Sequence, residues 1–285
     1  QTGATSIRPH RRCRVAAMGR DGSWDGPMVA IVAFDVDRVV GEVRNAADVF
    51  LRPRFRSLAA GDVREKSPGE VVTIADEECE AHLGAALLAV VPGSVLVGEE
   101  AASQDGSLLE LLAGDDPVWL LDPLDGTSAF AAGSSDYAVM AALVVRGETV
   151  LSVIHQPEYG RTFVAERGSG AHELGAGGLV ALVPGEPGGR LRGAVMRRFL
   201  PPEVAKAVEE NEGRFQSLEP VTKTAGIEYP AIAAGERDFL LYWRTLPWDH
   251  VPGGLLISEA GGKAAHLDGG CYRPAQRREG LLEGC

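Results

Sequence analysis

Apolar residues recur at every third or fourth position in two early segments of the chain, the spacing that places them on one face of an α-helix. The first segment spans residues 35–58, and the second spans about 76–91 and stops at a Pro-Gly pair. Charged residues, Gly and Pro fill the stretch between the two segments. The pattern therefore predicts two amphipathic helices joined by a polar loop.

Short apolar runs follow, and turns rich in Gly or in charge separate them. Runs of this kind are typical of β-strands, and their succession predicts an antiparallel meander. The predicted strands cover residues 95–98, 118–121, 137–145, 149–156 and 162–166. The stretch 175–189 is rich in Gly but has no periodicity, so we expect turns there.

The second half of the chain alternates between the two kinds of element. We expect strands near 194 and at 239–243, and helices at 201–212 and 249–260, the last of which ends at a Gly-Gly pair. Two helices on an antiparallel sheet, followed by an alternating half, indicate a mixed α+β or layered α/β fold.

The composition narrows the possible functions. With 285 residues, the chain can form one large domain or two coupled domains. Its formal net charge of −12 argues against nucleic acid and anionic membranes as partners, so a phosphate-bearing substrate requires local positive charge. No run approaches the roughly 18 apolar residues that span a bilayer.

The cysteines and the N-terminal segment bear on location. The four cysteines are scattered without disulfide or zinc-site spacing, which is typical of a protein of the reducing cytoplasm. Residues 1–27 begin with a basic stretch, and no apolar segment of a secretory signal follows it. We therefore predict a disordered extension at 1–27, with an upstream start ahead of Met28 or a basic transit segment as alternatives, and a cytoplasmic location.

Acidic residues stand where several apolar elements begin or end. Asp122 and Asp125 follow the run at 118–121, although burial and mutual repulsion disfavour two carboxylates there. Such a pair shares either a proton or a cation. Further acids stand in similar places at Asp76, Glu99, Glu100 and Asp249. A site rich in carboxylates and free of cysteine suits a hard cation such as Mg²⁺.

Two stretches carry a resemblance to a known family. "WLLDPLDGT" at 119–127 resembles the D-P-(I/L)-D-G-T signature of the inositol monophosphatase family, whose members are Mg²⁺-dependent, lithium-sensitive phosphatases. "WDHVPGGLLISEAGG" at 248–262 resembles the second signature of that family. The segments "EVVTIAD" and "VGEE" match its remaining metal and catalytic segments, in the same order. The resemblance covers residues 35–270.

The resemblance implies a site of two or three Mg²⁺ ions. Its ligands would be the side chains of Glu99, Asp122, Asp125 and Asp249 and the backbone carbonyl of Leu124. Asp122 would bridge metals, and a cation shared in this way accounts for Glu99 and Asp249, which a shared proton leaves unexplained. Thr127, held by Asp76, would orient the attacking water, with Glu99 as a further catalytic residue.

Substrate contacts are also implied. Asp125, Gly126, Thr127, Arg244 and Asp249 would bind the substrate, and Gly126 lets the backbone approach a phosphate closely. Inositol-specific members carry a glutamate shortly before the Trp-Asp pair, whereas this chain has no acid between Phe239 and Asp249. Arg244 either meets a second anionic group of the substrate or pairs with a nearby acid. His250 is expected on the surface, and Glu259 in a structural role.

The expected function is that of an Mg²⁺-dependent phosphomonoesterase that acts on a small phosphorylated polyol. A 3′(2′),5′-bisphosphate nucleotidase, a histidinol-phosphate phosphatase and a sugar bisphosphatase are alternatives within the superfamily. A non-catalytic regulatory protein on the same scaffold is an alternative of another class. The stretch "IVAFDVDRVV" at 31–40 resembles the aspartyl-phosphate motif of haloacid-dehalogenase phosphatases, but it lacks the small turn residues after the second Asp.

The fold implied by the resemblance is a layered αβαβα sandwich. Residues 28–150 would form a metal-binding α+β domain, and residues 151–285 an α/β domain that shapes the substrate site in the cleft between the two. Relatives of this kind are usually homodimers, so the resemblance leaves a homodimer open.

Overall fold

The computed structural model describes residues 12–15 and 32–284, apart from positions 60, 68, 176, 186, 187, 222, 223, 277 and 278. Within the predicted extension at 1–27, Arg12–Val15 form strand β1, which pairs antiparallel with β2 (Val32–Asp35). The rest of that extension lies outside the described residues. None of the described helices is long and apolar enough to cross a membrane.

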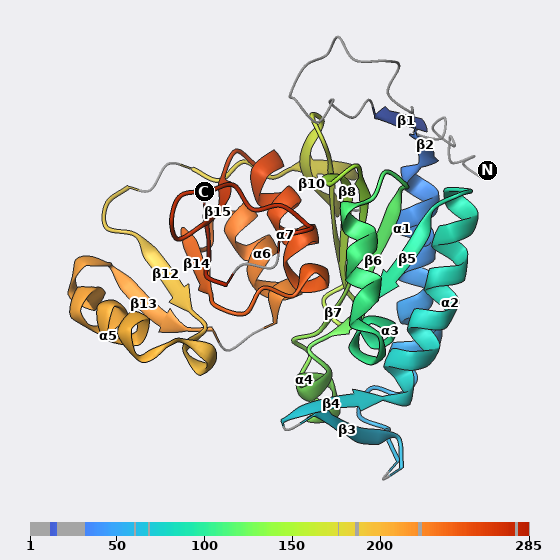
Figure 1. Cartoon of the computed structure of the whole chain (residues 1–285), viewed down its shortest axis with the longest axis horizontal. Helices are drawn as coiled ribbons and strands as arrows, with labels where there is room; N and C mark the ends of the chain where they lie inside the picture. Colours follow the sequence, from blue (N-terminus) through green and yellow to red (C-terminus); the bar gives the residue numbers. More distant parts are fainter. Residues whose placement is uncertain are drawn as a thin grey trace, which may run out of the picture.

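A seven-stranded sheet forms the larger part of the molecule (Figure 1). Its strands are β5 (Val95–Gly98), β6 (Val118–Asp125), β7 (Ala138–Val145), β8 (Glu148–Gln156), β9 (Arg161–Glu166), β10 (Gly170–Gly175) and β11 (Gly178–Ala181), in the order β11-β10-β9-β8-β7-β6-β5. All neighbours are antiparallel except β5 and β6, which are parallel. Residue 150 lies within β8, so the division into halves at that position stays a prediction.

The expectation of turns throughout 175–189 is wrong for Gly178–Ala181. These residues pair antiparallel with β10 and form the edge strand β11. The segment has no strand periodicity of its own, and its extended conformation follows from the partner strand that it meets in the folded chain.

Helices cover both faces of this sheet. Helix α1 (Val36–Ala46), the π-helical turn at Ala47–Leu51 and α2 (Ile74–Val90) pack on one face, while α6 (Ala225–Ala233) and α7 (Pro247–Glu259) lie on the other (Figure 1). In β6, Trp119 belongs to the core under α1 and α2, whereas Leu120 belongs to a core that contains Trp248 of α7. Because both faces are buried, the strand reads as an unbroken apolar run.

The helix predicted for 35–58 begins as expected but ends earlier. The carboxylate of Asp35 accepts a hydrogen bond from the amide of Arg38 and caps α1, so this part of the sequence is a helix start and not a strand-turn motif. Helical structure ends at Leu51, and turns follow up to Arg56, whose φ is 58°. The apolar periodicity beyond Leu51 therefore marks side chains that pack from turns.

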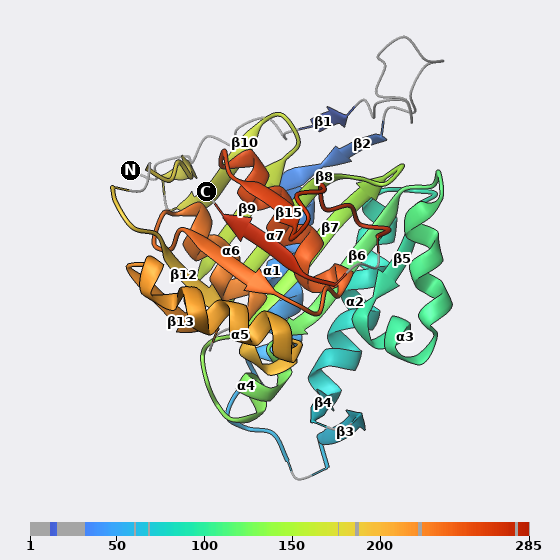
Figure 2. The ribbon, with the colours of Figure 1, turned by 60° about the vertical axis from the view of Figure 1, so that its left-hand side comes forward.

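A second sheet lies beyond α6 and α7 (Figures 1 and 2). Its strands are β12 (Arg192–Val195), β13 (Ser217–Pro220), β14 (Phe239–Tyr242), β15 (Lys263–His266) and β16 (Leu281–Gly284), in the order β13-β12-β14-β16-β15. Helix α5 (Pro202–Asn211) covers its outer side. The predicted αβαβα sandwich is confirmed.

Short elements complete the chain. They are the hairpin of β3 (Val63–Ser67) and β4 (Glu70–Thr73), helices α3 (Glu99–Gln104) and α4 (Thr127–Ala131), and 3₁₀ turns η2 (Gly106–Ala113), η3 (Arg197–Phe199) and η4 (Glu212–Arg214). At the end of α7, the Glu259 carboxylate accepts hydrogen bonds from the amides of Gly168 and Gly170, which ties this helix to the β9–β10 turn.

Close packing of α6 on α7 depends on one glycine. A methyl group added to Gly253 would lie 2.2 Å from Cγ of Tyr229, whereas one added to Gly254 would meet its nearest atom at 3.5 Å. We expect Gly253→Ala to lower the free energy of unfolding by about 1–3 kcal/mol through overpacking. Gly254→Ala is the matched control, expected to gain about 0.5–1 kcal/mol of helix stability. Urea denaturation of both variants measures the difference, and equal stabilities would contradict this account of the packing.

Candidate active site

A bulge in β6 brings the two aspartates of the first signature to one side of the strand. Asp122 pairs with Met140 of β7, and Asp125 pairs with Ala138, so three steps along β6 correspond to two along β7. In a regular strand, residues three apart point to opposite faces. The extra residue shifts this alternation, and both carboxylates therefore face the same way. Pro123 lies within the bulge, where its missing N–H leaves no gap in the ladder.

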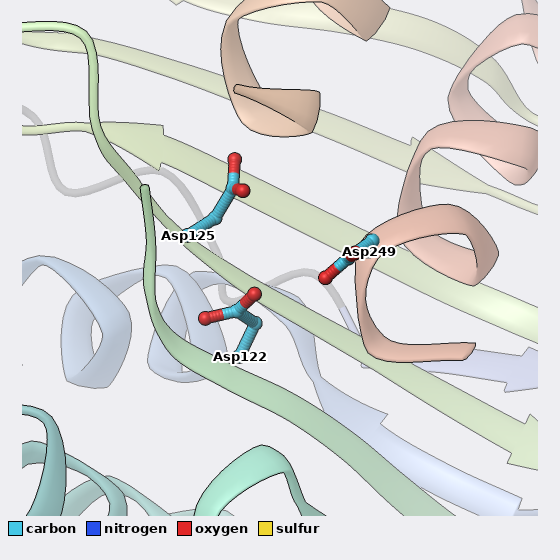
Figure 3. Close-up of side chains that lie close together, drawn as sticks. All are labelled: Asp122, Asp125 and Asp249. Atoms are coloured by element: carbon cyan, nitrogen blue, oxygen red, sulfur yellow. The ribbon is translucent and has the colours of Figure 1, made fainter. Parts of the chain in front are cut away.

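Helix α7 adds a third carboxylate from a distant part of the chain. Asp249 lies in the first turn of α7, and its side chain points toward Asp122 and Asp125 (Figure 3). The three residues, called the aspartate triad below, offer oxygen atoms that all lie within 4.8 Å of one another. Among the described residues, no Lys or Arg side chain forms an ion pair with any of them. A set of buried oxygen donors without a counter-charge suits a hard divalent cation.

Burial and mutual repulsion raise the pKa values of all three carboxyl groups. For Asp122 the pKa is well above its ordinary value because of burial first and then the charges of Glu99, Asp125 and Asp249. Burial raises the pKa of Asp125 to about 6, against hydrogen bonds from the start of α6 that lower it. One of these is donated by the amide of Gly226 to Oδ2 at 2.5 Å. Burial, Asp125 and Glu99 likewise raise the pKa of Asp249.

Thr127 and Asp76 form a hydrogen-bonded pair beside the triad. The Thr127 hydroxyl lies 2.8 Å from Oδ1 of Asp76 and 3.1 Å from the carbonyl oxygen of Leu124. The other carboxylate oxygen of Asp76 accepts from the amide and the hydroxyl of Thr73 in a capping box at the start of α2. The helix cap therefore fixes the orientation of Asp76, which is fully buried, and burial raises its pKa to about 6.

Gly126 connects the triad to α4. Its φ is 94°, a left-handed conformation that favours glycine, and a methyl group there would lie 2.3 Å from the side chain of Thr224. The predicted reason for this glycine was a close approach of substrate phosphate. The structure shows a close approach of the β13–α6 loop at this glycine, and the approach of phosphate stays a prediction.

Glu99 lies beside Asp122 of the triad and is also held by a lysine. The ammonium group of Lys66 lies 2.7 Å from Oε1 of Glu99 and 2.8 Å from Oε1 of Glu100. Lys66 belongs to β3, so this contact ties the β3–β4 hairpin to the start of α3. Glu99 and Lys66 both line the same cavity as the triad, which has a volume of about 470 Å³.

Two further residues of this cavity have definite partners. Arg244 forms an ion pair with Glu70 of β4, so it pairs with a nearby acid. It also lines the cavity, a position compatible with contact to a second anionic group of the substrate. His250 is buried, contrary to the surface position expected for it. Its Nδ1 lies 2.7 Å from the Tyr229 hydroxyl and its Nε2 lies 3.0 Å from the Arg244 carbonyl, and burial lowers its pKa to about 4. Packing of α7 between two sheets buries even its first turn.

Comparison with known proteins decides the family. The sequence profile of the inositol monophosphatase family matches residues 35–283. The chain belongs to this family. Among family relatives, the fructose-1,6-bisphosphatase/inositol-1-monophosphatase of Thermotoga maritima is 27% identical over 213 residues, which are 72% of this chain and 75% of the relative. The Nus factor SuhB of Pseudomonas aeruginosa is 32% identical over 228 residues, which are 75% of this chain and 80% of the relative.

Solved structures of the inositol monophosphatase family share the fold. An IMPase of Thermotoga maritima superimposes with a TM-score of 0.72, covers 87% of this chain and 91% of its own, and is 24% identical. The five layers are thus those of a known architecture.

Sequence reasoning missed several residues that line the cavity of this family member. They include Met196, Arg198, Phe199, Val221, Thr224, Tyr242 and Leu246. Most come from the second sheet and its loops, which carry no signature. Their one common signal is a position at the end of β12, β13 or β14, and that signal becomes visible only when the sheet order is known.

The aspartate triad makes the free energy of unfolding of the metal-free protein depend on pH. Between the ordinary aspartate pKa of about 3.9 and the raised value of about 6 at Asp125, the folded state binds more protons than the unfolded state. The free energy of unfolding should therefore fall as pH rises through this window, and the loss is complete above it. Added Mg²⁺ replaces the protons, so it should raise the melting temperature more at pH 8 than at pH 5. At an Mg²⁺ concentration of one hundred times Kd, the free energy of unfolding rises by about 2.7 kcal/mol.

Differential scanning fluorimetry with Mg²⁺ or EDTA measures this dependence. Asp116→Asn, an exposed position ahead of β6, is the control variant and should keep the full Mg²⁺ response. A melting temperature that Mg²⁺ changes equally at both pH values would show that the triad does not bind the metal.

Proposed function

We propose that this chain is an Mg²⁺-dependent phosphomonoesterase that hydrolyses a small phosphorylated polyol or a related metabolite. The observation that carries the proposal is the convergence of Asp122, Asp125 and Asp249 beside the Thr127–Asp76 pair. Three oxygen donors for a hard cation and a hydroxyl held by a buried carboxylate are what metal-assisted hydrolysis requires. The name of the Thermotoga maritima relative, a fructose-1,6-bisphosphatase/inositol-1-monophosphatase, supports the same reaction class.

The aspartate triad fits a hard divalent cation, and we expect two or three Mg²⁺ ions at the site. The candidate ligands are the triad, Glu99 and the carbonyl oxygen of Leu124; Lys66 contacts only Oε1 of Glu99. When bound, Mg²⁺ supplies positive charge for the phosphate and acidifies a water molecule.

The side chains of the protein provide position and proton transfer. In our proposal, the Thr127 hydroxyl accepts a hydrogen bond from the attacking water while it donates its own proton to Oδ1 of Asp76. The water oxygen forms a bond to phosphorus while the ester P–O bond breaks, and the proton that the attacking water loses is balanced by the proton that the leaving alkoxide takes up to become the alcohol. The amides of Gly126 and Thr127 would bind a phosphate oxygen, and Asp125 and Asp249 would accept from substrate hydroxyl groups.

Release of inorganic phosphate tests the proposal. The panel contains inositol 1-phosphate, histidinol phosphate, a 3′,5′-bisphosphate nucleotide and a sugar bisphosphate, each with Mg²⁺, with Mg²⁺ and Li⁺, and with EDTA. We expect release from at least one substrate with Mg²⁺, lower release with Li⁺ and none with EDTA. Equal release with Mg²⁺ and EDTA would contradict the metal mechanism.

A second candidate function follows from the relatives named Nus factor SuhB, from Pseudomonas aeruginosa and Escherichia coli. A role of that kind needs no hydrolysis. We favour hydrolysis because Asp122, Asp125, Asp249 and Thr127 are all present and lie together. A chain that binds Mg²⁺ but releases phosphate from no member of the panel would favour the Nus-factor role. The absence of nucleic-acid partners, a cytoplasmic location and a homodimer stay predictions.

A further inference from the structure

Two arginines line the part of the cavity that the second sheet builds. Arg198 lies in η3, directly after β12, and its guanidinium carbon is 5.1 Å from the centre of the Phe199 ring. The guanidinium carbon of Arg244 is 5.4 Å from the centre of the same ring. All three residues line the triad cavity, so both guanidinium groups flank one ring on its wall.

One lysine and two arginines line the cavity, and only two of these three cations have a carboxylate partner among the described residues. Lys66 is paired with Glu99 and Glu100, and Arg244 is paired with Glu70. Arg198 forms no ion pair with any described residue, and its guanidinium lies over Phe199 and against the backbone of Gly69 in the β3–β4 turn. The cavity therefore holds one cation whose counter-charge the described chain does not supply.

A buried hydroxyl in the same cavity also lacks a partner. Tyr242, at the end of β14, is 5% exposed, its ring packs on Tyr229 and His250, and it lines the cavity. The hydroxyl itself is buried and has no hydrogen-bond partner among the described residues. A buried polar group without a partner costs about 1–3 kcal/mol. A bound ligand with an acceptor oxygen would remove that penalty.

We propose that Arg198, Arg244 and the Tyr242 hydroxyl form a subsite for a second anionic group of the substrate. The substrate class is then a phosphomonoester of a polyol or sugar that carries a second phosphate or a carboxylate. Guanidinium groups and a phenol all donate hydrogen bonds, and guanidinium binds phosphate and carboxylate with two parallel bonds. This inference rests on the proposed function and specifies its substrate.

Three substrates with one carbon skeleton test the subsite. Sorbitol 6-phosphate has a neutral far end, 6-phosphogluconate has a carboxylate there, and sorbitol 1,6-bisphosphate has a phosphate. We expect the wild-type kcat/KM to be at least about tenfold higher for the two substrates with a second anion, since one charged hydrogen bond contributes roughly this factor. The ratio of the two higher values distinguishes a phosphate subsite from a carboxylate subsite.

Variants test which residues cause the preference for substrates with a second anionic group. Arg198→Gln should lower the preference for a second anion about tenfold, mainly through KM, and Tyr242→Phe should lower it several-fold. Arg197→Gln is the matched control, because Arg197 is the neighbouring residue, pairs with Glu212 at 3.6 Å and does not line the cavity. We expect it to keep the wild-type preference.

Each outcome is decisive. Equal kcat/KM for the three substrates, or a loss in Arg198→Gln that is the same for all three, would overturn the subsite while leaving the proposed function intact. If Tyr242→Phe lowers kcat/KM equally for all three substrates, Tyr242 is not part of the subsite. A chain inactive on all three and on the wider phosphomonoester panel would refute the proposed function, and the subsite with it.

Discussion

Replacement of Asp122 by Asn is expected to reduce Mg²⁺-dependent phosphate release by about 10³-fold. Asn keeps the shape of the side chain but removes the charge that, in our proposal, would help to hold the metal ions. Metal-supplied charge stabilisation is worth several kcal/mol, and each 1.4 kcal/mol or so is tenfold in rate. The measurement is kcat/KM for the best substrate of the panel, at saturating Mg²⁺.

Stability separates this loss from simple unfolding. In the metal-free protein, burial and the neighbouring charges of Glu99, Asp125 and Asp249 raise the pKa of Asp122, so Asn resembles the protonated form already favoured there. We therefore expect the metal-free variant to melt no lower than the wild type, but to lose most of its response to Mg²⁺. Asp116→Asn should retain both activity and response. Activity within tenfold of the wild type in Asp122→Asn would remove Asp122 from the metal site.

Replacement of Thr127 by Ala is expected to lower kcat by about 10²-fold, and replacement by Ser by less than about tenfold. Ala removes the hydroxyl that Asp76 holds at 2.8 Å, whereas Ser keeps it on a smaller side chain. Positioned proton transfer contributes about 10²–10⁴-fold, and Mg²⁺ already activates the water, so the lower end applies. Steady-state kinetics on the three proteins give the comparison.

Metal binding serves as the control for the Thr127 variants. The aspartate triad is unchanged in both, so Mg²⁺ should raise the melting temperature of each as much as in the wild type. If Ala and Ser are equally impaired, the hydroxyl is not the functional group and the Thr127–Asp76 pair has a structural role only.

Local signals in the sequence account for much of the fold. The capping box of Thr73 and Asp76 begins α2, and Asp35 begins α1, because side chains that cap a helix act on amides two or three residues away. The apolar runs predicted β5 to β9 to within one residue at each end, except that β6 continues to Asp125. Edge strand β11 was missed because its conformation depends on its pairing with β10 and not on its own pattern.

The candidate site, like the fold, has features that the sequence predicted and features that it did not. The signatures predicted that Asp122, Asp125 and Asp249 act together, and the folded chain brings them into one group. No pattern predicted that Lys66 holds Glu99, which acid pairs with Arg244, or that the Tyr242 hydroxyl has no hydrogen-bond partner among the described residues. The two ion pairs join segments far apart in the chain, and side chains that meet in this way leave no periodic mark on either segment.

The sequence by itself determined many of the longer helices and strands, the family and the acids that can hold a metal, since these depend on neighbours within a few residues or on a signature kept in order. The tertiary structure alone decided which charges balance one another, that His250 is buried, and that Arg198 forms no ion pair with any described residue. Desolvation and pairing depend on distances between segments far apart in the chain, and those distances exist only after α7 and the two sheets have packed together.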